Sequence, residues 1–346
     1  MSLDLTPRDR WAIETMRRHR VVLAELAAEA EEASDPVSAC RLWLALGRQA
    51  ASYQRYLDPW RRSPAFARTM AEISQHYRIL EDHERRAAAE VAGIGQVTRE
   101  RSRRQLGLRL AVVGKGGAGK TLLASTVARV LAQRGRRVLA VDLDTNPGLT
   151  TSLGMPLTEA GLPAEVLEQN AGANYGWHLA TGVSPRHVVE RCSVVGPDGV
   201  RFLGVGKISS PDKEAAKQSV AALVQVLLGF GDPDWDVVAD LEAGPTTPFE
   251  RYHAFADEAV VVVGPAWRSA LTARRLLPML NDQCPMVVGN RFRDEPDHPG
   301  LAPVARIPFD PEVAAAEREG LAPMDVCPDA QALEAVAQFT ERLLKK

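Results

Sequence analysis

A glycine-rich stretch from Gly114 to Thr121, GKGGAGKT, contains the residue types that bind the phosphates of a nucleotide. It matches the pattern G-x-x-x-x-G-K-[ST], with Gly119, Lys120 and Thr121 at its end. Glycines let the backbone wrap around a phosphate, so that successive N–H groups and the start of the following helix face the anion. Lys120 is expected to bridge the β- and γ-phosphates, and the Thr121 hydroxyl to ligate Mg²⁺. The stretch therefore predicts a site for a nucleoside triphosphate and Mg²⁺.

The same loop contains a second lysine, Lys115, directly after its first glycine. From that position the side chain does not easily fold back onto the phosphate that its own loop encloses. We therefore expect Lys115 to point outward, away from the nucleotide of its own chain.

A strand before the loop and a helix after it must hold the loop in place, and residues 107–346 supply both. Seven short apolar runs predict strands. They are residues 108–113, 137–143, 200–205, 235–241, 259–264, 285–290 and 304–308. Strands this apolar are covered on both faces, which is typical of a mostly parallel sheet with helices on each side. We predict an α/β fold, a doubly wound mostly parallel sheet of the P-loop NTPase type, with a helix over 119–134.

The first 106 residues have a different composition, with 18 arginines, no lysine and 15 acidic residues. Apolar residues recur there at helical spacing in three stretches. These residues are Trp11, Met16, Val22, Leu23, Leu26 and Ala30, then Leu42, Leu46, Tyr53 and Leu57, then Ile73, Tyr77 and Leu80. Helix breaks are expected at 34–36 and 58–64. We predict a small all-α helical bundle over residues 1–106, followed by a nucleotide-binding domain over 107–346.

The K-G-G-x-x-K-[ST] form of the loop resembles the deviant Walker A motif of the MinD, ParA and nitrogenase-iron-protein (SIMIBI) class of P-loop ATPases. Segments 140–150, 236–251, 288–292 and 307–320 resemble the same class in the same order. The D-x-E-A-G stretch that starts at Asp240 looks most like CooC, the nickel-insertion ATPase for carbon monoxide dehydrogenase. In this class ATP is sandwiched in a homodimer, and the lysine that corresponds to Lys115 reaches the nucleotide of the other subunit. The resemblance thus implies an ATPase that is slow without its partner, with ATP and Mg²⁺ as cofactors.

The resemblance also implies the roles of individual residues. It gives catalytic roles to Lys115, Lys120 and Asp144, the last of which orients the attacking water. It implies Mg²⁺ ligation by Thr121, Asp142 and Asp240, with the carboxylates acting through water. Nucleotide contacts are implied for Gly114, Gly116, Gly117, Ala118, Gly119, Lys120, Thr121, Leu122, Gly244, Asn290, Arg291 and Pro308. Among these, Gly244 senses the γ-phosphate, Asn290 reads the adenine edge, and the segment around Pro308 packs on the ring. The sequence departs from the family at Thr145, where proline is usual.

Composition limits the other classes of function. The chain has 42 basic and 44 acidic residues, so no global field attracts nucleic acid or an anionic membrane. Four cysteines lie far apart without a C-x-x-C pair, and neither a disulfide framework nor a zinc cluster is expected. No signal peptide or membrane-spanning stretch is evident, and the terminal helix over 332–346 is expected to pack on the sheet. A cytoplasmic protein is therefore expected.

Several functions stay open at this point. The favoured interpretation is an ATP-dependent homodimeric switch that acts on a protein partner through the helical bundle, with metalloenzyme maturation as a candidate role. A ParA-like DNA-associated ATPase would need a basic surface, whereas residues 107–346 carry a net charge of −5. A nickel or zinc metallochaperone of CooC type would need a C-x-C motif, and residues 206–220 contain no cysteine. A nucleotide-binding scaffold without turnover is the remaining alternative.

Overall fold

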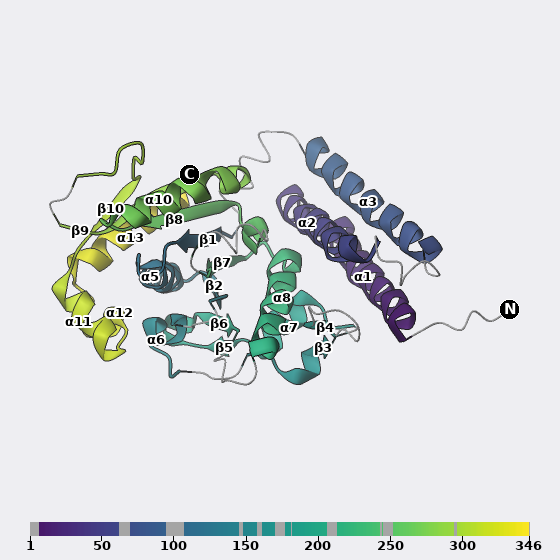
Figure 1. Ribbon diagram of the computed structural model, residues 1–346, viewed down its shortest axis with the longest axis horizontal. Coiled ribbons are helices and arrows are strands. Elements are labelled where there is room, and N and C mark those ends of the chain that lie inside the picture. The colour runs from purple at the N-terminus through teal and green to yellow at the C-terminus, as the bar shows by residue number, and fades with distance from the viewer. Residues whose placement is uncertain are drawn as a thin grey trace. The chain divides into compact units, whose positions relative to one another are not determined.

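The apolar runs predicted as strands come together in one eight-stranded sheet (Figure 1). The computed structural model describes residues 7–61, 70–94, 107–144, 148–157, 161–169, 177–180, 182–205, 213–242, 244, 252–293 and 296–345. The strands are β1 Arg109–Gly114, β2 Arg137–Asp142, β5 Val194–Val195, β6 Arg201–Gly204, β7 Trp235–Asp240, β8 Glu258–Val263, β9 Met286–Phe292 and β10 Ala305–Pro308. Their order is β10-β9-β8-β1-β7-β2-β6-β5, and all neighbours are parallel except β5 and β6. The predicted fold class is confirmed.

The register of the central strands brings their ends to one edge of the sheet. Asp142, the last residue of β2, lies opposite Asp240, the last residue of β7. Gly114, at the end of β1, lies opposite Val262 of β8. The glycine-rich loop and both carboxylates therefore meet at one edge, which is where ligands bind in open α/β sheets.

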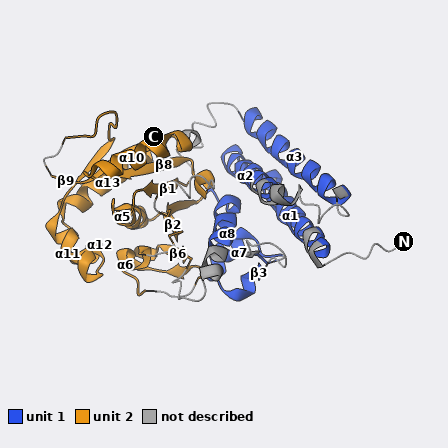
Figure 2. Cartoon of the chain, in the orientation of Figure 1, with its two compact units in different colours: residues 1–106, 162–192, 213–233 blue, residues 107–161, 193–212, 234–346 orange. Residues whose placement is uncertain are grey.

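The chain forms two compact units, shown in different colours in Figure 2. The unit that holds the sheet comprises residues 107–161, 193–212 and 234–346, and the other comprises 1–106, 162–192 and 213–233. The limit at 106/107 coincides with the predicted domain boundary, but two later segments join the N-terminal residues in the second unit. The division into domains 1–106 and 107–346 stays a prediction.

Helices in the sheet unit close an apolar core over the strands. They are α5 Lys120–Gln133, α6 Leu149–Leu153, α10 Trp267–Leu276, α11 Pro311–Glu319, α12 Pro323–Val326 and α13 Gln331–Lys345, with 3-10 turns η3 Pro197–Gly199, η4 Tyr252–Phe255 and η5 Leu277–Gln283. Helices α5 and α13 share one cluster of buried side chains with the strands. Leu333, Phe339 and Leu343 of α13 lie in this cluster. The expectation that the terminal helix packs on the sheet is confirmed.

The second unit contains the three predicted N-terminal helices and several later elements. They are α1 Pro7–Glu32, α2 Pro36–Arg61, α3 Met70–Gly93, η2 Ala164–Val166, β3 Leu167–Gln169, β4 Trp177–Leu179, α7 Pro185–Cys192 and α8 Lys213–Gly229. Met16, Leu46 and Leu80 are among the residues that form the shared core of α1, α2 and α3. The Asp35 carboxylate accepts hydrogen bonds of 2.9 Å from the N–H groups of Val37 and Ser38, which caps α2 where the sequence predicts a break. The predicted bundle is confirmed.

Two glycines at the end of α8 let α2 approach closely. A Cβ on Gly231 would lie 2.9 Å from Leu42 Cδ2 and 3.2 Å from Ala45 Cβ. A Cβ on Gly229 would lie 2.8 Å from Pro185 Cγ. Because real side chains do not tolerate contacts below about 3 Å, a side chain at 231 would displace Leu42 of α2, and one at 229 would displace Pro185 of α7. The helical bundle is thus packed tightly against later parts of its own unit.

Two buried histidines link the bundle helices. His19 Nδ1 and His76 Nε2 lie 3.3 Å apart and share a hydrogen bond, and the His19 ring stacks on Tyr53 with centroids 3.6 Å apart. Both histidines are at most 5% exposed. Burial, together with the charge of Arg20, lowers the pKa of His76 to about 4. His76 is therefore neutral at pH 7.

Because His76 is buried, we expect the protein to lose stability in mild acid. An unfolded histidine has a pKa of about 6.5, so between roughly pH 6.5 and pH 4 the unfolded chain binds the extra proton and the folded chain does not. We expect the free energy of unfolding to fall by about 2 kcal/mol between pH 7 and pH 5 because of this group. Denaturant unfolding of His76→Gln should lack this part of the pH dependence, whereas the exposed-site control His187→Gln should retain it. Equal pH dependence in His76→Gln and the wild type would contradict the assignment.

Candidate functional site

The glycine-rich loop joins β1 to α5 in the geometry that a phosphate cradle needs. Gly119 adopts φ +93° at the N-cap of α5, a left-handed conformation that side chains rarely adopt. A Cβ at this position would also lie 1.9 Å from Asn290 Nδ2. Lys120 is the first residue of α5 and is 6% exposed, and Leu122 is buried behind it. The loop therefore leads into a helix N-terminus, which favours a bound anion.

Thr121 and Asp240 face each other below the loop. The Thr121 hydroxyl donates a hydrogen bond of 2.6 Å to Asp240 Oδ2. The other carboxylate oxygen, Oδ1, is buried and has no hydrogen-bond partner among the described residues. A buried oxygen without a partner is unfavourable, and a hard cation with its waters would satisfy it. The pair has the donor set expected for Mg²⁺.

Asp142 organises the loop that follows β2. Its Oδ1 accepts a hydrogen bond of 3.0 Å from the Asp144 N–H, and its Oδ2 accepts bonds of 3.1 and 3.0 Å from the N–H groups of Gly148 and Leu149. The side chain thereby caps the start of α6 from a neighbouring strand. Asp142 is fully buried, while Asp144 is partly buried. Thr145, where the sequence departs from the family pattern, lies outside the described residues.

The two strand-end carboxylates have perturbed acidities. Burial, followed by repulsion from Asp142, raises the pKa of Asp240 to about 7, although the charge of Lys120 opposes the shift. Burial also raises the pKa of Asp142, against the hydrogen bonds that it accepts from Leu149 and Asp144. Two buried carboxylates at one sheet edge make the site receptive to a cation.

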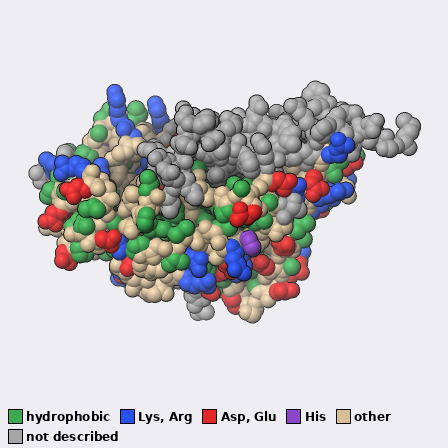
Figure 3. All heavy atoms as spheres, turned by 90° about the horizontal axis from the view of Figure 1, so that it is seen from below, with side chains coloured by type: hydrophobic (Ala, Val, Ile, Leu, Met, Phe, Trp, Pro, Cys, Tyr) green, Lys and Arg blue, Asp and Glu red, His purple; other side chains and the backbone are tan. Residues whose placement is uncertain are grey.

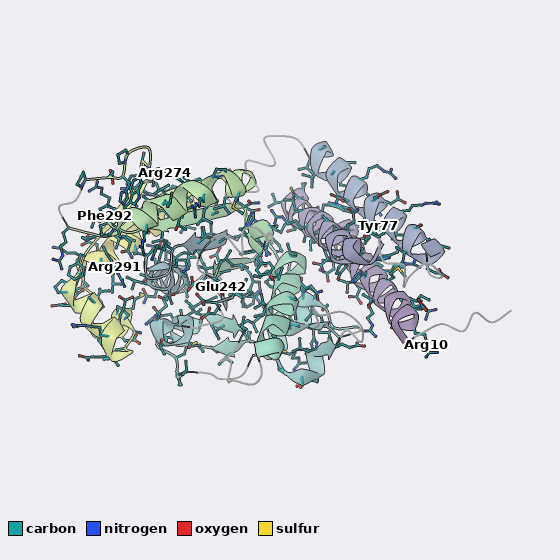
Figure 4. The ribbon with its side chains drawn as sticks, in the orientation of Figure 1. Arg10, Tyr77, Glu242, Arg274, Arg291 and Phe292 are labelled. Carbon is teal, nitrogen blue, oxygen red and sulfur yellow. The ribbon has the colours of Figure 1, made fainter. Side chains whose placement is uncertain are left out.

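Three predicted contact residues hold the loop itself. The Gly244 N–H donates a hydrogen bond of 3.2 Å to the Gly114 carbonyl. Asn290 Nδ2 donates to the Ala118 carbonyl at 2.8 Å. Arg291, which is labelled in Figure 4, donates from Nη1 to the Gly117 carbonyl at 3.2 Å. Asn290 is 1% exposed, and its Oδ1 has no partner among the described residues.

The remaining predicted residues lie around this loop. Gly116 and Gly117 are exposed, and Ala118 is buried. Pro308 is half-buried at the end of β10, opposite Phe292 of β9. Lys115 is half-buried, and its Nζ donates an exposed hydrogen bond of 3.3 Å to the adjacent Gly116 carbonyl. The predicted residues are thus gathered at one sheet edge, and their roles toward a nucleotide stay predictions.

The geometry of the loop agrees with a family assignment. The protein-family model described as CbiA, the CobQ/CobB/MinD/ParA nucleotide-binding domain, matches residues 110–324 of the sequence. The chain belongs to this family of P-loop ATPases. As a member of the CobQ/CobB/MinD/ParA family, the chain is a nucleotide-binding ATPase. Three N-terminal helices that pack together precede the matched domain.

Curated relatives align with about three fifths of the chain. An ATP-binding protein of Methanocaldococcus jannaschii is 27% identical over 231 residues, which cover 61% of this chain and 88% of the relative. The carbon monoxide dehydrogenase accessory protein CooC of Rhodospirillum rubrum is 28% identical over 243 residues, which cover 64% of this chain and 91% of CooC. Both alignments leave about a third of this chain unmatched.

Solved MinD structures show the same fold. The cell division ATPase MinD of Pyrococcus furiosus aligns with a TM-score of 0.53 at 22% identity, covering 68% of this chain and 98% of MinD. MinD of Pyrococcus horikoshii, solved with Mg-ADP, aligns with a TM-score of 0.52 at 19% identity, covering 69% and 96%. The family fold therefore occupies the part of this chain that holds the sheet and its flanking helices.

The described part of this family member contains neither a further metal cluster nor a membrane helix. No group of three or more His, Cys, Asp or Glu side chains among these residues is placed to hold a metal ion. Residues 206–212, part of the cysteine-free segment 206–220, lie outside the described residues. Among the helices that the structure describes, none is both long and apolar enough to cross a bilayer.

The sequence did not reveal two charged side chains that form ion pairs in the sheet unit, one of them with a residue of the loop site. Arg129 of α5 is 5% exposed and forms ion pairs of 2.6 Å with both Asp198 and Asp325. Glu317 of α11 forms an ion pair of 2.6 Å with Arg291. Arg129 lies 69 and 196 residues from its partners along the chain, so no local pattern in the sequence marks these pairs.

We expect that neutralising Asp240 raises the free energy of unfolding and lowers the turnover of ATP. Because its pKa is higher in the folded than in the unfolded chain, stability falls as the pH rises from about 4 through about 7. Asp240→Asn removes this loss but cannot hold the cation as a carboxylate does. With EDTA present, we expect the variant to exceed the wild type in unfolding free energy by about 1–3 kcal/mol at pH 8, with a smaller difference at pH 5.

Chemical unfolding and Mg²⁺-dependent phosphate release measure the two effects. Asp329→Asn, an exposed-site control, should change neither. An Asp240→Asn protein that is less stable than the wild type at pH 8 would contradict the electrostatic account.

Proposed function

We propose that this chain is an ATP-hydrolysing switch in which ATP and Mg²⁺ join two copies face to face. In the closed dimer, each Lys115 reaches the nucleotide bound by the other copy. The contrast between the two lysines of the loop is the observation that supports this proposal most directly. Lys120 is 6% exposed and its charge acts on Asp240. Among the described residues, Lys115 forms one exposed hydrogen bond, to the adjacent carbonyl, so little in this part of the chain holds its ammonium group.

The residues at the sheet edge fit a triphosphate and Mg²⁺ on structural grounds. Gly119 provides a cradle that any Cβ would obstruct, and both Asp240 and Asn290 keep a buried oxygen without a partner among the described residues. When bound, Mg²⁺ would offset the charge of the phosphate oxygens. Thr121 and Asp240 would hold it, with Asp142 nearby through water.

Each side chain has a defined task in the proposed hydrolysis. Lys120 binds the β- and γ-phosphates, and Asp144 orients the attacking water. Phosphoryl transfer passes through a loose transition state, so orientation of the water is sufficient and a strong base is not required. Asn290, Arg291 and Pro308 form the proposed adenine end of the site.

The nucleotide state would be read by a protein partner, and we propose that the N-terminal helices contribute to that surface. The central helix α2 is unavailable, because Leu42, Trp43 and Leu46 are buried. The exposed faces of α1 and α3 are rich in charged side chains, including the ion pair between Glu31 and Arg86. These faces suit a polar protein partner.

Because of the similarity to CooC, the partner that we propose first is a metalloenzyme undergoing maturation. The lack of cysteine in residues 206–220 favours a role that uses nucleotide-driven movement without carriage of a soft metal. Nucleic acid is a less suitable partner. On the face drawn in Figure 3, acidic and basic side chains are interspersed, and no single-sign stripe crosses its visible part.

Replacing Lys115 tests the dimer. We expect wild-type protein to dimerise with a non-hydrolysable ATP analogue and to be monomeric with ADP, measured by light scattering after size exclusion. Lys115→Ala should bind ATP with an affinity near that of the wild type and lose turnover by about 100-fold or more, because its contact is made only across the dimer. Lys120→Ala, the matched variant in the same loop, should lose nucleotide binding itself.

Mixing variants distinguishes action across the dimer from action within one chain. Lys115→Ala and Asp144→Asn should each be inactive alone. In the mixed dimer, one nucleotide is held by a chain with Asp144 and faces a copy with Lys115, so turnover should return in part. A mixture as inactive as its components, or normal turnover of Lys115→Ala, would reject the role of Lys115 across the dimer.

A further inference from the structure

A β-bulge at Arg291 directs a charged side chain toward the phosphate loop. In the pairing of β9 with β10, Asn290 lies opposite Ile307 and Phe292 lies opposite Pro308, so Arg291 is an extra residue without a partner in the register. Its φ is +62°, which is uncommon for a residue other than glycine. Bulges of this kind change the direction of a side chain at the end of a strand and are frequent beside active sites.

The Arg291 guanidinium joins the loop to helix α11. Nη1 donates to the Gly117 carbonyl at 3.2 Å, and Nη2 lies 2.6 Å from Glu317 Oε2 (Figure 4). A guanidinium is planar and always charged, so fixing one of its nitrogens restricts the direction of the other. Glu317 therefore determines where Arg291 can donate.

Glu317 is itself held by a rigid helix. The Asp310 carboxylate caps α11 by accepting hydrogen bonds from the N–H groups of Glu312 and Val313, at 3.0 and 3.3 Å. Val313 is buried in the core of the sheet unit, and Ala316 is also buried. The side chain at 317 therefore projects from a fixed backbone, and supporting residues of this kind keep a site close to its productive geometry.

We propose that Glu317 is a positioning residue for the phosphate loop: acting through Arg291, it fixes the Gly117 carbonyl, so that the loop is already shaped for phosphate before nucleotide binds. The proposal rests on the nucleotide site of the proposed function and adds a residue to it. Asn290 holds the next carbonyl, that of Ala118, at 2.8 Å. The C=O and N–H groups of a peptide point in opposite directions, so a fixed Ala118 carbonyl also fixes the direction of the Gly119 N–H. A site shaped in advance loses less entropy on binding.

Glu317→Gln tests the proposal in the full chain, since it removes the charge and keeps the size. We expect the Kd for Mg-ADP, measured by calorimetry, to rise about three- to tenfold. The kcat at saturating ATP should stay within about twofold, since the contact of Glu317 with Arg291 affects the ground state and the transition state alike. Amide hydrogen exchange of the loop peptide in nucleotide-free protein should become faster. Glu319→Gln, an exposed residue of the same helix, is the matched control and should leave all three unchanged.

A double-mutant cycle separates positioning from general stability. On the Arg291→Met background, Glu317→Gln should have no further effect on the Kd for Mg-ADP or on loop exchange, because its only route to the loop has been removed. Additive effects of the two substitutions, or an unchanged Kd and exchange rate in Glu317→Gln, would overturn the proposal. The Mg-ADP measurement needs no dimer, so a failure of dimerisation would reject the proposed switch without affecting this result.

Discussion

A phosphate-binding loop must leave its N–H groups available to the ligand, and its carbonyl groups therefore need partners elsewhere in the protein. Here two segments at the edge of the sheet supply these partners. Gly244, after β7, donates to Gly114, and two residues at the end of β9 donate to the carbonyls of Gly117 and Ala118. Because an unpaired backbone group is costly to bury, the buried contact between Asn290 and Ala118 stabilises the loop, while the contact between Arg291 and Gly117 is exposed.

The same sheet edge contains two buried carboxylates whose charges are unfavourable there. Asp142 and Asp240 are buried at the ends of strands that lie side by side, and the pKa of each is raised chiefly by burial. Asp142 is stabilised by three backbone N–H groups, whereas one oxygen of Asp240 has no partner among the described residues. An arrangement that is unfavourable in the empty site and favourable around a cation is typical of a functional site, where stability is exchanged for activity.

Much of the fold was predictable because its elements are marked locally. All seven predicted strands are present, since each is a short and nearly continuous apolar run. The bundle core also agrees with the helical spacing, in residues such as Met16, Leu46 and Leu80. The short strands β3, β4 and β5 were missed, because two or three residues carry no readable period.

The site was predictable only in part, for a different physical reason. The phosphate loop and the strand-end carboxylates follow a sequence pattern tied to chemistry, so residues such as Thr121 and Asp240 could be placed together. The contacts of Arg291 could not be predicted, because they depend on a bulge in the pairing of β9 with β10. Glu317 lies in a segment that resembles the family, but no pattern there marks it as a partner of Arg291, and this contact is visible only once α11 has been placed.

The helical unit consists of segments that are synthesised at different times. Its tight contact between Leu42 and Gly231 joins residues separated by most of the unit's length along the chain. During synthesis, α1, α2 and α3 leave the ribosome together, but the surface that α2 presents to the end of α8 has no counterpart until residue 231 has emerged. Domains usually fold from the N-terminus as units. This one remains incomplete until residue 231 has emerged, and by then four strands of the sheet, β1, β2, β5 and β6, have also been translated.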